Sequence, residues 1–197
     1  MVKKCCWYFG GLILLTMGQR LFVEAGFGAG SLDALCVGLS EITALSAGSW
    51  VWITGIVMML TSAILLGRRP TFTVLVTSFL FGGFFDLWGV LFQRLLTNQE
   101  LVFKILTYII GIILAPLGTA IYFQSGFSKS AFDEFVVAIK DKAKIGIGRA
   151  KTIVEITLCI IACLIGGPIG ITTFITAVLF GPILQGMLKL TGKRKYV

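Results

Sequence analysis

The chemistry open to this chain depends on a few acidic and amide side chains that lie inside apolar sequence. The chain has no histidine, which is the commonest catalytic base and metal ligand. The most informative acid is Asp86, in the run LFGGFFDLWGVLF. A charge in such a run costs several kcal/mol unless it is paired, hydrated or protonated. Asp86 is therefore a candidate for binding a substrate or a coupled proton or ion, and a structural hydrogen bond is the alternative.

A second acid, Glu155, interrupts another apolar run. Arg149 and Lys151 lie close to it in the sequence, so a salt bridge is the alternative to a role in binding. Enzyme chemistry is not expected, because the chain has no nucleophile elbow, no phosphate-binding loop and no cluster of metal ligands. The sequence therefore predicts no catalytic residue, no metal and no cofactor.

Membrane helices must position these side chains. The chain is 57% hydrophobic and 13% charged, with a mean hydropathy of +0.97, whereas a soluble domain carries about 25% charged residues. A membrane helix needs about 20 mainly apolar residues. Six segments meet this requirement and predict an all-α, polytopic membrane protein: residues 7–25, 48–66, 72–94, 102–124, 150–166 and 169–189.

The basic residues predict how these helices are oriented. If the N-terminus is cytoplasmic, all but three of the 17 lysines and arginines lie on the cytoplasmic side, and the exceptions are Arg20, Arg94 and Lys104. Because cytoplasmic loops are rich in lysine and arginine, both termini are predicted to be cytoplasmic. The net charge of +8 then reflects topology and anionic lipid, so a nucleic-acid partner is not expected.

The sequence of the first half recurs in the second half. Residues 11–56 align with residues 111–156 without a gap, and the identical pairs include Gly26/Gly126, Phe27/Phe127, Asp33/Asp133 and Val37/Val137. Each half contains three predicted spans, an odd number, so the second half must enter the membrane from the opposite side. We therefore expect a single membrane domain, residues 1–197, built as an inverted-topology repeat of residues 7–95 and 102–190. This architecture is typical of secondary transporters, whose binding sites lie near the middle of the membrane.

A short amphipathic segment follows the first span of each half: residues 31–42 and 130–142. Ser31 and Ser130 are expected to cap these two helices. Asp33 and Asp133 then lie in the first turns, where a negative charge suits the helix dipole. Two interpretations remain open for these segments. Either they are interfacial helices in which the acids only cap, or they are re-entrant half-helices in which Asp33 and Asp133 shape the two entrances of a substrate path.

The repeat also relates the remaining candidates to each other. Gln185 corresponds to Asp86, and the two are predicted to approach each other across the pseudo-symmetry axis. Glu155 corresponds to a glycine, which leaves space for a ligand. The rings of Trp52 and Tyr122 are candidates for stacking on a flat ligand, and aromatic belts at the membrane surfaces are the alternative.

Four motifs resemble a known family: GLSEITALSAG, the turn GRRP, the run FLFGGFFDL and the late segment GGPIGITTFITAVLFGPILQ. Together they are similar to the YczE-like (YczE/YyaS/YitT) family of bacterial integral membrane proteins, over nearly the whole chain. The resemblance implies a bacterial cytoplasmic membrane and a small-molecule role, because some members are suspected vitamin or metabolite transporters and others are linked to secondary-metabolite production. The segment FSKSAFDEF departs from the glycine-rich pattern expected of the second copy, which argues against symmetric binding by the two loops.

The sequence as a whole predicts a transporter that lies in the lipid bilayer and moves a vitamin- or metabolite-like molecule by alternating access. Asp86, Gln185 and Glu155 would line its site. One alternative is a substrate-capturing subunit of a vitamin importer, although the first span lacks the Ala-x-x-x-Ala-like seam through which such subunits dock. Another is a non-transporting membrane scaffold or accessory protein for a biosynthetic or regulatory complex. The glycine pairs at residues 10–11 and 166–167 would also permit a homodimer.

Overall fold

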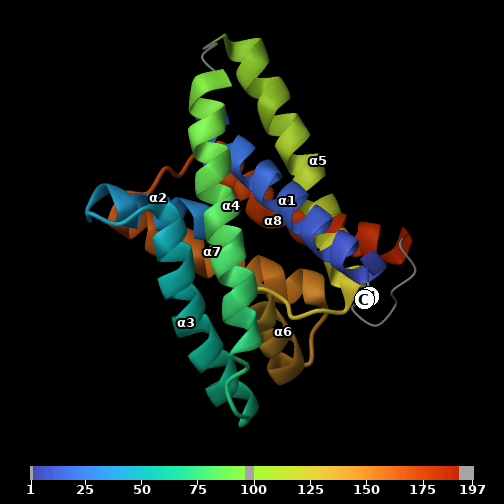
Figure 1. Ribbon diagram of the computed structural model, residues 1–197. Helices are drawn as coiled ribbons and strands as arrows, with labels where there is room; N and C mark the ends of the chain where they lie inside the picture. The colour runs from blue at the N-terminus through green and yellow to red at the C-terminus, as the bar shows by residue number, and fades with distance from the viewer. Residues whose placement is uncertain (1, 96–99, 191–197) are drawn as a thin grey trace.

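The computed structural model describes residues 2–95 and 100–190, and every regular element within these ranges is an α-helix (Figure 1). The helices are α1 (Val2–Ala25), α2 (Ser31–Glu41), α3 (Ala47–Leu66), α4 (Thr73–Leu95), α5 (Leu101–Ser125), α6 (Ala131–Ala143), α7 (Ile147–Ile165) and α8 (Ile171–Leu190). The prediction of an all-α protein is confirmed for the described residues. Below, the first half means α1 to α4 and the second half means α5 to α8.

Five of these helices are long and apolar enough to cross a membrane: α1, α3, α4, α5 and α8. α7 has 19 residues, and the charged residues Arg149, Lys151 and Glu155 keep it out of this group. The predicted span at residues 150–166 lies on α7. Length and composition within the described part of the chain therefore support five of the six predicted spans.

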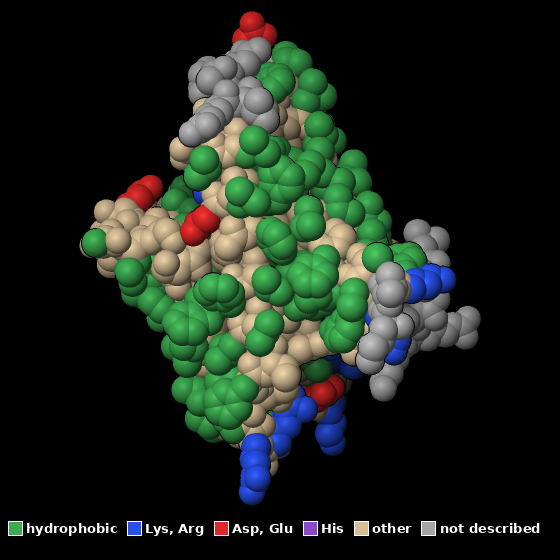
Figure 2. Space-filling view, in the orientation of Figure 1, with side chains coloured by type: hydrophobic (Ala, Val, Ile, Leu, Met, Phe, Trp, Pro, Cys, Tyr) green, Lys and Arg blue, Asp and Glu red, His purple; other side chains and the backbone are tan. Residues whose placement is uncertain are grey.

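The outer surface carries large apolar side chains that would be unfavourable in water. Ile64, Leu164 and Ile171 are between 74% and 82% exposed. Figure 2 shows hydrophobic side chains over the visible flanks of the molecule, with lysines and arginines at the lower tip and on the right-hand side. Apolar surface on this scale is expected where helices face lipid.

The contact between α1 and α5 forms the centre of the fold, and the two helices pack together closely (Figure 1). Glycines bring the two backbones together. A side-chain carbon built on Gly18 would lie 2.5 Å from the backbone nitrogen of Ala115, and one built on Gly111 would lie 2.8 Å from the carbonyl oxygen of Gly18. Any larger residue at these positions would push the helices apart. The first helix of each half is thus locked against its counterpart.

The other helices surround this pair. α4 packs on α1 and α8 packs on α5, while α3 pairs with α4 and α7 pairs with α8. The two short helices link the halves, because α2 packs on α7 and α6 packs on α3. The first six residues of α2 are all buried, so this helix begins inside the protein.

The two short helices start differently, although the sequence predicts a serine cap for both. Ser130 does cap α6, because its Oγ accepts a hydrogen bond from the backbone N–H of Asp133 at 3.1 Å. The predicted cap of α2 is wrong: Gly30 is the N-cap residue and makes no side-chain cap bond, and Ser31 is the first helical residue. The hydroxyl of Ser31 donates instead to Glu155 of α7. A carboxylate acceptor makes a stronger hydrogen bond than a backbone group, and only the tertiary fold brings Glu155 to Ser31.

Candidate functional site

A small cavity of about 30 Å³, called the central cavity below, lies between the two halves. Side chains from α1 through α8 all contribute to its wall. The volume is enough for water, whereas pockets that hold drug-sized ligands measure roughly 300–1,000 Å³. The polar part of the wall is Gln19, Thr54, Ser78, Thr119, Ser130, Asp133 and Lys151.

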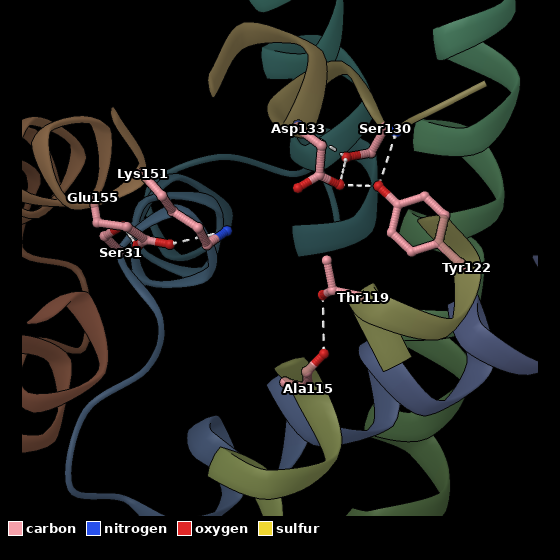
Figure 3. A network of polar contacts seen from close by, with 8 residues as sticks. All are labelled: Ser31, Ala115, Thr119, Tyr122, Ser130, Asp133, Lys151 and Glu155. Atoms are coloured by element: carbon pink, nitrogen blue, oxygen red, sulfur yellow. Dashed lines mark hydrogen bonds and ion pairs between the residues drawn. The ribbon is translucent and has the colours of Figure 1, made fainter. Parts of the chain in front are cut away.

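Asp133 lies on one side of the central cavity, in the first turn of α6, and one of its carboxylate oxygens accepts two hydrogen bonds (Figure 3). Its Oδ2 accepts hydrogen bonds from the hydroxyl of Tyr122 and, at 2.7 Å, from Ser130 Oγ. Tyr122 is only 1% exposed, and its ring packs edge-on against Tyr8 and Phe123. Tyr122 therefore supports Asp133 here, and its ring has no open face for the predicted stacking on a ligand.

Lys151 and Glu155 form a second polar network on the other side of the central cavity (Figure 3). Lys151 Nζ lies 3.6 Å from Glu155 Oε1, and Ser31 Oγ donates to Glu155 Oε2. The ammonium of Lys151 also lies over the rings of Phe132 and Phe180, at 4.4 and 4.3 Å from their centroids. The salt bridge that the sequence offered as the alternative role of Glu155 is thus formed. Lys151, rather than Glu155, lines the central cavity.

Asp33 occupies the position in α2 that Asp133 occupies in α6, yet its surroundings differ. It is 0% exposed, and neither carboxylate oxygen has a hydrogen-bond partner among the described residues. Burial in α2, a helix too short to span the membrane, raises the pKa of Asp33 to about 8. The negative charge of Glu155 also raises this pKa, while Lys151, Arg20 and the neighbouring amide of Gln19 lower it. No donor reaches either carboxylate oxygen with hydrogen-bond geometry among the described residues, so Asp33 is buried without the bonds that an ionised carboxylate needs.

Asp86 binds the start of α3 rather than the central cavity. Its Oδ1 accepts the backbone N–H of Gly48 at 3.0 Å, and its Oδ2 accepts Ser46 Oγ at 2.8 Å. The structural hydrogen bond that the sequence offered as the alternative is thus present. Asp86 also lines a separate surface hollow of about 360 Å³ together with Trp52, which is 42% exposed.

Gln185 has the corresponding place in the second half. Its Oε1 lies next to Gly148 in the first turn of α7, where an added side-chain carbon would be 3.1 Å away. The structure therefore does not bring Asp86 and Gln185 together as predicted. Each side chain contacts the third helix of its own half. The direction in which a helical side chain points depends on how the helix packs, and an alignment of the two halves does not contain this information.

The two ends of the molecule are opened to different extents. The end formed by the α3–α4 turn, the α5–α6 loop and the start of α1, called the basic end, holds a cleft of about 760 Å³. Arg68 and Glu134 form a salt bridge of 2.7 Å at this cleft. Lys129 also lines it, and burial lowers the pKa of Lys129 to about 8, against the opposing effect of the nearby Asp133 charge.

The opposite end, called the glycine end, is formed by residues 26–30 and the α7–α8 turn at residues 166–170. Ala29 N–H donates to the carbonyl oxygen of Pro168 at 3.1 Å, and Thr172 Oγ1 donates to the carbonyl oxygen of Gly28 at 3.1 Å. Gly170 lies directly against the backbone of the first loop. The hollow between these two segments measures about 170 Å³, smaller than the cleft at the basic end, and direct backbone contacts close the glycine end.

Of the polar residues that line the central cavity, the sequence predicted only Asp133 as a site residue, and the missed ones include Lys151 and Gln19. A signal existed for Lys151, since a lysine four residues before a glutamate on a helix predicts a side-chain ion pair. The signal for Gln19 was weaker: an amide beside Arg20 in an apolar run gives no direction for its side chain.

Three comparisons place the chain among known sequences. A family model described as "Family of unknown function (DUF6198)" matches residues 2–189. The "Uncharacterized protein YyaS" of Bacillus subtilis is 34% identical, over 90% of this chain and 89% of that protein. The "Uncharacterized membrane protein YczE" of the same organism is 27% identical, over 94% and 85%, and an "Uncharacterized protein" of Haemophilus influenzae is 23% identical, over 94% and 84%. No solved structure matches.

Proposed function

The chain belongs to the DUF6198 family of unknown function, and we propose that it is a small-molecule transporter that works by alternating access. The matches to YyaS and YczE confirm the resemblance to the YczE-like family, and the name of YczE describes a membrane protein. One observation carries the proposal: a cavity lined by helices of both halves lies between two ends that differ in how far they are open. A transporter of this kind needs one site and two ends that open in turn.

The proposal includes an inverted repeat, in which α1 to α4 correspond to α5 to α8. The packing supports it, because each contact has an equivalent in the other half. The contact of α2 with α7 corresponds to that of α6 with α3, and the contact of α4 with α1 corresponds to that of α8 with α5. Equivalent side chains also make equivalent contacts, since Asp86 meets Gly48 and Gln185 meets Gly148. Two related halves can adopt similar arrangements with their roles exchanged, which allows either end to open at similar free energy.

The repeat makes α7 the sixth span and the counterpart of α3. Its charges are compatible with a place in the membrane, because Lys151 and Glu155 are buried in the protein and neutralise each other. Membrane charges of this kind face the interior of a bundle and mark a pathway or a site. We place the protein in the bacterial cytoplasmic membrane, with the basic end and both termini in the cytoplasm, because lysines and arginines concentrate on that side.

We place the substrate in the central cavity, between the network of Asp133 and the ammonium of Lys151. The cavity of about 30 Å³ must widen before it can hold a metabolite, so the structure corresponds to a state with a closed site. Asp86, Gln185 and Trp52 do not line this cavity. In this proposal Asp86 and Gln185 hold the starts of the third helices, and Glu155 acts by positioning Lys151.

A non-transporting scaffold is the second candidate, because the small central cavity also suits a protein that carries no cargo. A substrate-capturing importer subunit has no specific support here. For a homodimer, two of the four predicted glycines are already used inside the chain, since Gly11 lies against Tyr122 and Gly167 against Ala34. Gly10 faces open space, so the predicted homodimer remains a prediction.

A thermal-stability screen would separate transport from scaffolding. The detergent-purified protein is heated with each member of a library of vitamins, amino acids and other metabolites. A ligand present at 100 times its Kd should stabilise the folded protein by about 2.7 kcal/mol. Gln19→Met removes a polar group from the central cavity, and Gln185→Met is the matched control outside it. We expect a ligand whose effect disappears in the first variant and persists in the second.

The hit would then be tested for uptake into vesicles that contain the purified protein. A well-folded protein that responds to no compound in the library would favour the scaffold. A hit that survives Gln19→Met and is lost in Gln185→Met would place the substrate away from the central cavity and refute the site assignment.

A further inference from the structure

Asp33 and Asp133 are equivalent in the repeat, but only Asp133 has hydrogen-bond donors. The hydroxyl groups of Tyr122 and Ser130 donate to Asp133 in the second half. At the corresponding first-half positions the chain has Phe22 and Gly30, neither of which has a side-chain hydroxyl. A side-chain carbon on Gly30 would lie 2.7 Å from Asp33 Oδ2, so the carboxylate fills the space that a serine would use.

The charges around Asp33 are already paired. Two cations act on it, Arg20 from α1 and Lys151 from α7. Arg20 forms a 2.9 Å salt bridge with Glu24, and Lys151 pairs with Glu155. Both pairs are neutral as a unit, so an ionised Asp33 would leave one net negative charge in a buried cluster. Such a charge is strongly unfavourable in an apolar environment.

The side chain of Gln19 lies beside Asp33, and its amide lowers the pKa of Asp33 without making a bond of hydrogen-bond geometry to either carboxylate oxygen. Its Oε1 is buried and has no hydrogen-bond partner among the described residues. Two acceptors next to each other, both without a donor, are satisfied if one of them carries a proton. A protonated carboxyl group has an O–H that donates, and a Gln carbonyl oxygen accepts.

The space beside this pair excludes larger ligands. A cavity of about 10 Å³ lies against Gln19, Gly30, Ser31 and Glu155, which is too small for an organic ammonium group and close to the lower limit for a single water. No group of three or more His, Cys, Asp or Glu side chains that could hold a metal ion is found in the described part of the chain. A proton needs no volume and supplies the missing donor.

We propose that Asp33 is a proton-binding site, which carries its proton in this closed state and donates it in a hydrogen bond to Gln19. The site lies three residues after Gly30, where the closed glycine end begins. Opening that end would separate residues 26–30 from residues 168–170, admit water to the start of α2 and allow the proton to leave. This coupling role rests on the proposed transport function. In it Asp33, and not Asp86, is the group that couples substrate movement to protons.

Infrared spectroscopy of the full-length purified protein tests the site without any transport assay. At neutral pH the wild-type spectrum should contain the carbonyl band of a protonated carboxylic acid. Asp33→Asn should lose this band, and the matched control Asp133→Asn should keep it. The band should also fade as the pH rises through about 8. Loss of the band in Asp133→Asn alone, or no such band in the wild type, would overturn the proposal.

The folding of Asp33→Asn is itself informative, because an amide resembles the neutral acid in shape and charge. We expect the variant to fold as well as the wild type. A variant that fails to fold would show that the structure needs the negative charge, which contradicts a protonated Asp33. Stabilisation of the wild type by sodium, lost in Asp33→Asn, would assign the site to a metal cation and would also overturn the proposal.

Uptake in vesicles then separates the two proposals. If the infrared band is present but no substrate is transported, the proton site stands and the transporter proposal fails. If uptake is driven by a pH gradient in the wild type and in Asp33→Asn alike, the transporter stands and the coupling role of Asp33 fails. Loss of the pH-gradient effect in Asp33→Asn alone is the result we expect.

Discussion

Replacing one glycine in the contact between α1 and α5 should destabilise the protein, whereas replacing another on the same helix should not. A side-chain carbon on Gly18 would lie 2.5 Å from the backbone nitrogen of Ala115. Heavy atoms pack favourably at about 3.5–4.0 Å. The Gly18→Ala variant must therefore move two backbones apart by about 1 Å, and overpacking of this kind costs about 1–3 kcal/mol.

Gly10→Ala is the matched control, because a side-chain carbon on Gly10 has nothing within 4 Å. Both variants gain the same helix propensity, about 1 kcal/mol for alanine over glycine. This gain cancels in the comparison, so the difference between the two variants measures the contact alone. We expect Gly18→Ala to be less stable than Gly10→Ala by about 1–3 kcal/mol.

The free energy of unfolding can be measured for both variants by denaturant titration in detergent, followed by circular dichroism. Gly118→Ala should repeat the effect from the other helix, since Gly118 meets the backbone of Leu15. Equal stability of Gly18→Ala and Gly10→Ala would mean that α1 and α5 do not pack as described. The arrangement of the central cavity would then be wrong as well.

Three further predictions concern single charged groups. Asp86→Asn removes one of the acceptors at the start of α3, so the free energy of unfolding should fall by about 0.5–2 kcal/mol. The ligand found in the stability screen should still bind to this variant. Unchanged stability together with lost binding would show that Asp86 belongs to the binding site. For Lys129, the pKa falls from 10.5 to about 8 on folding, so between these values the unfolded chain holds more protons and stability should rise with pH. Asp33 has the opposite sign, because its pKa rises from 3.8 to about 8 on folding, and stability should fall with rising pH across that window. Both effects can be measured as the unfolding temperature at stepped pH. The rise in stability at alkaline pH should be absent in Lys129→Met, and the fall in stability at lower pH should be absent in Asp33→Asn. If either pH dependence remains in the corresponding variant, that residue is not its cause.

Local features of the sequence predicted much of the fold. Runs of about 20 apolar residues correspond to α1, α3, α4, α5 and α8, and the two short segments at residues 31–42 and 130–142 correspond to α2 and α6. The nearby lysine of Glu155 also predicted its salt bridge. Each of these features depends on residues within one or two helical turns, where composition and spacing are sufficient.

Contacts between distant segments were not available from the sequence. Ser31 and Glu155 are separated by 124 positions and meet only because α2 packs on α7. Asp86 and Gln185 correspond in the alignment, yet the rotation of α4 and α8 directs each toward its own half. Apolar content and recurring residues are properties of the chain, so they predict a helical protein with several apolar segments of membrane length and an acid at the same place in two similar segments. That Asp133 has donors at hydrogen-bond geometry and Asp33 has none follows from the folded arrangement, because hydrogen bonds between elements depend on where the helices bring their side chains.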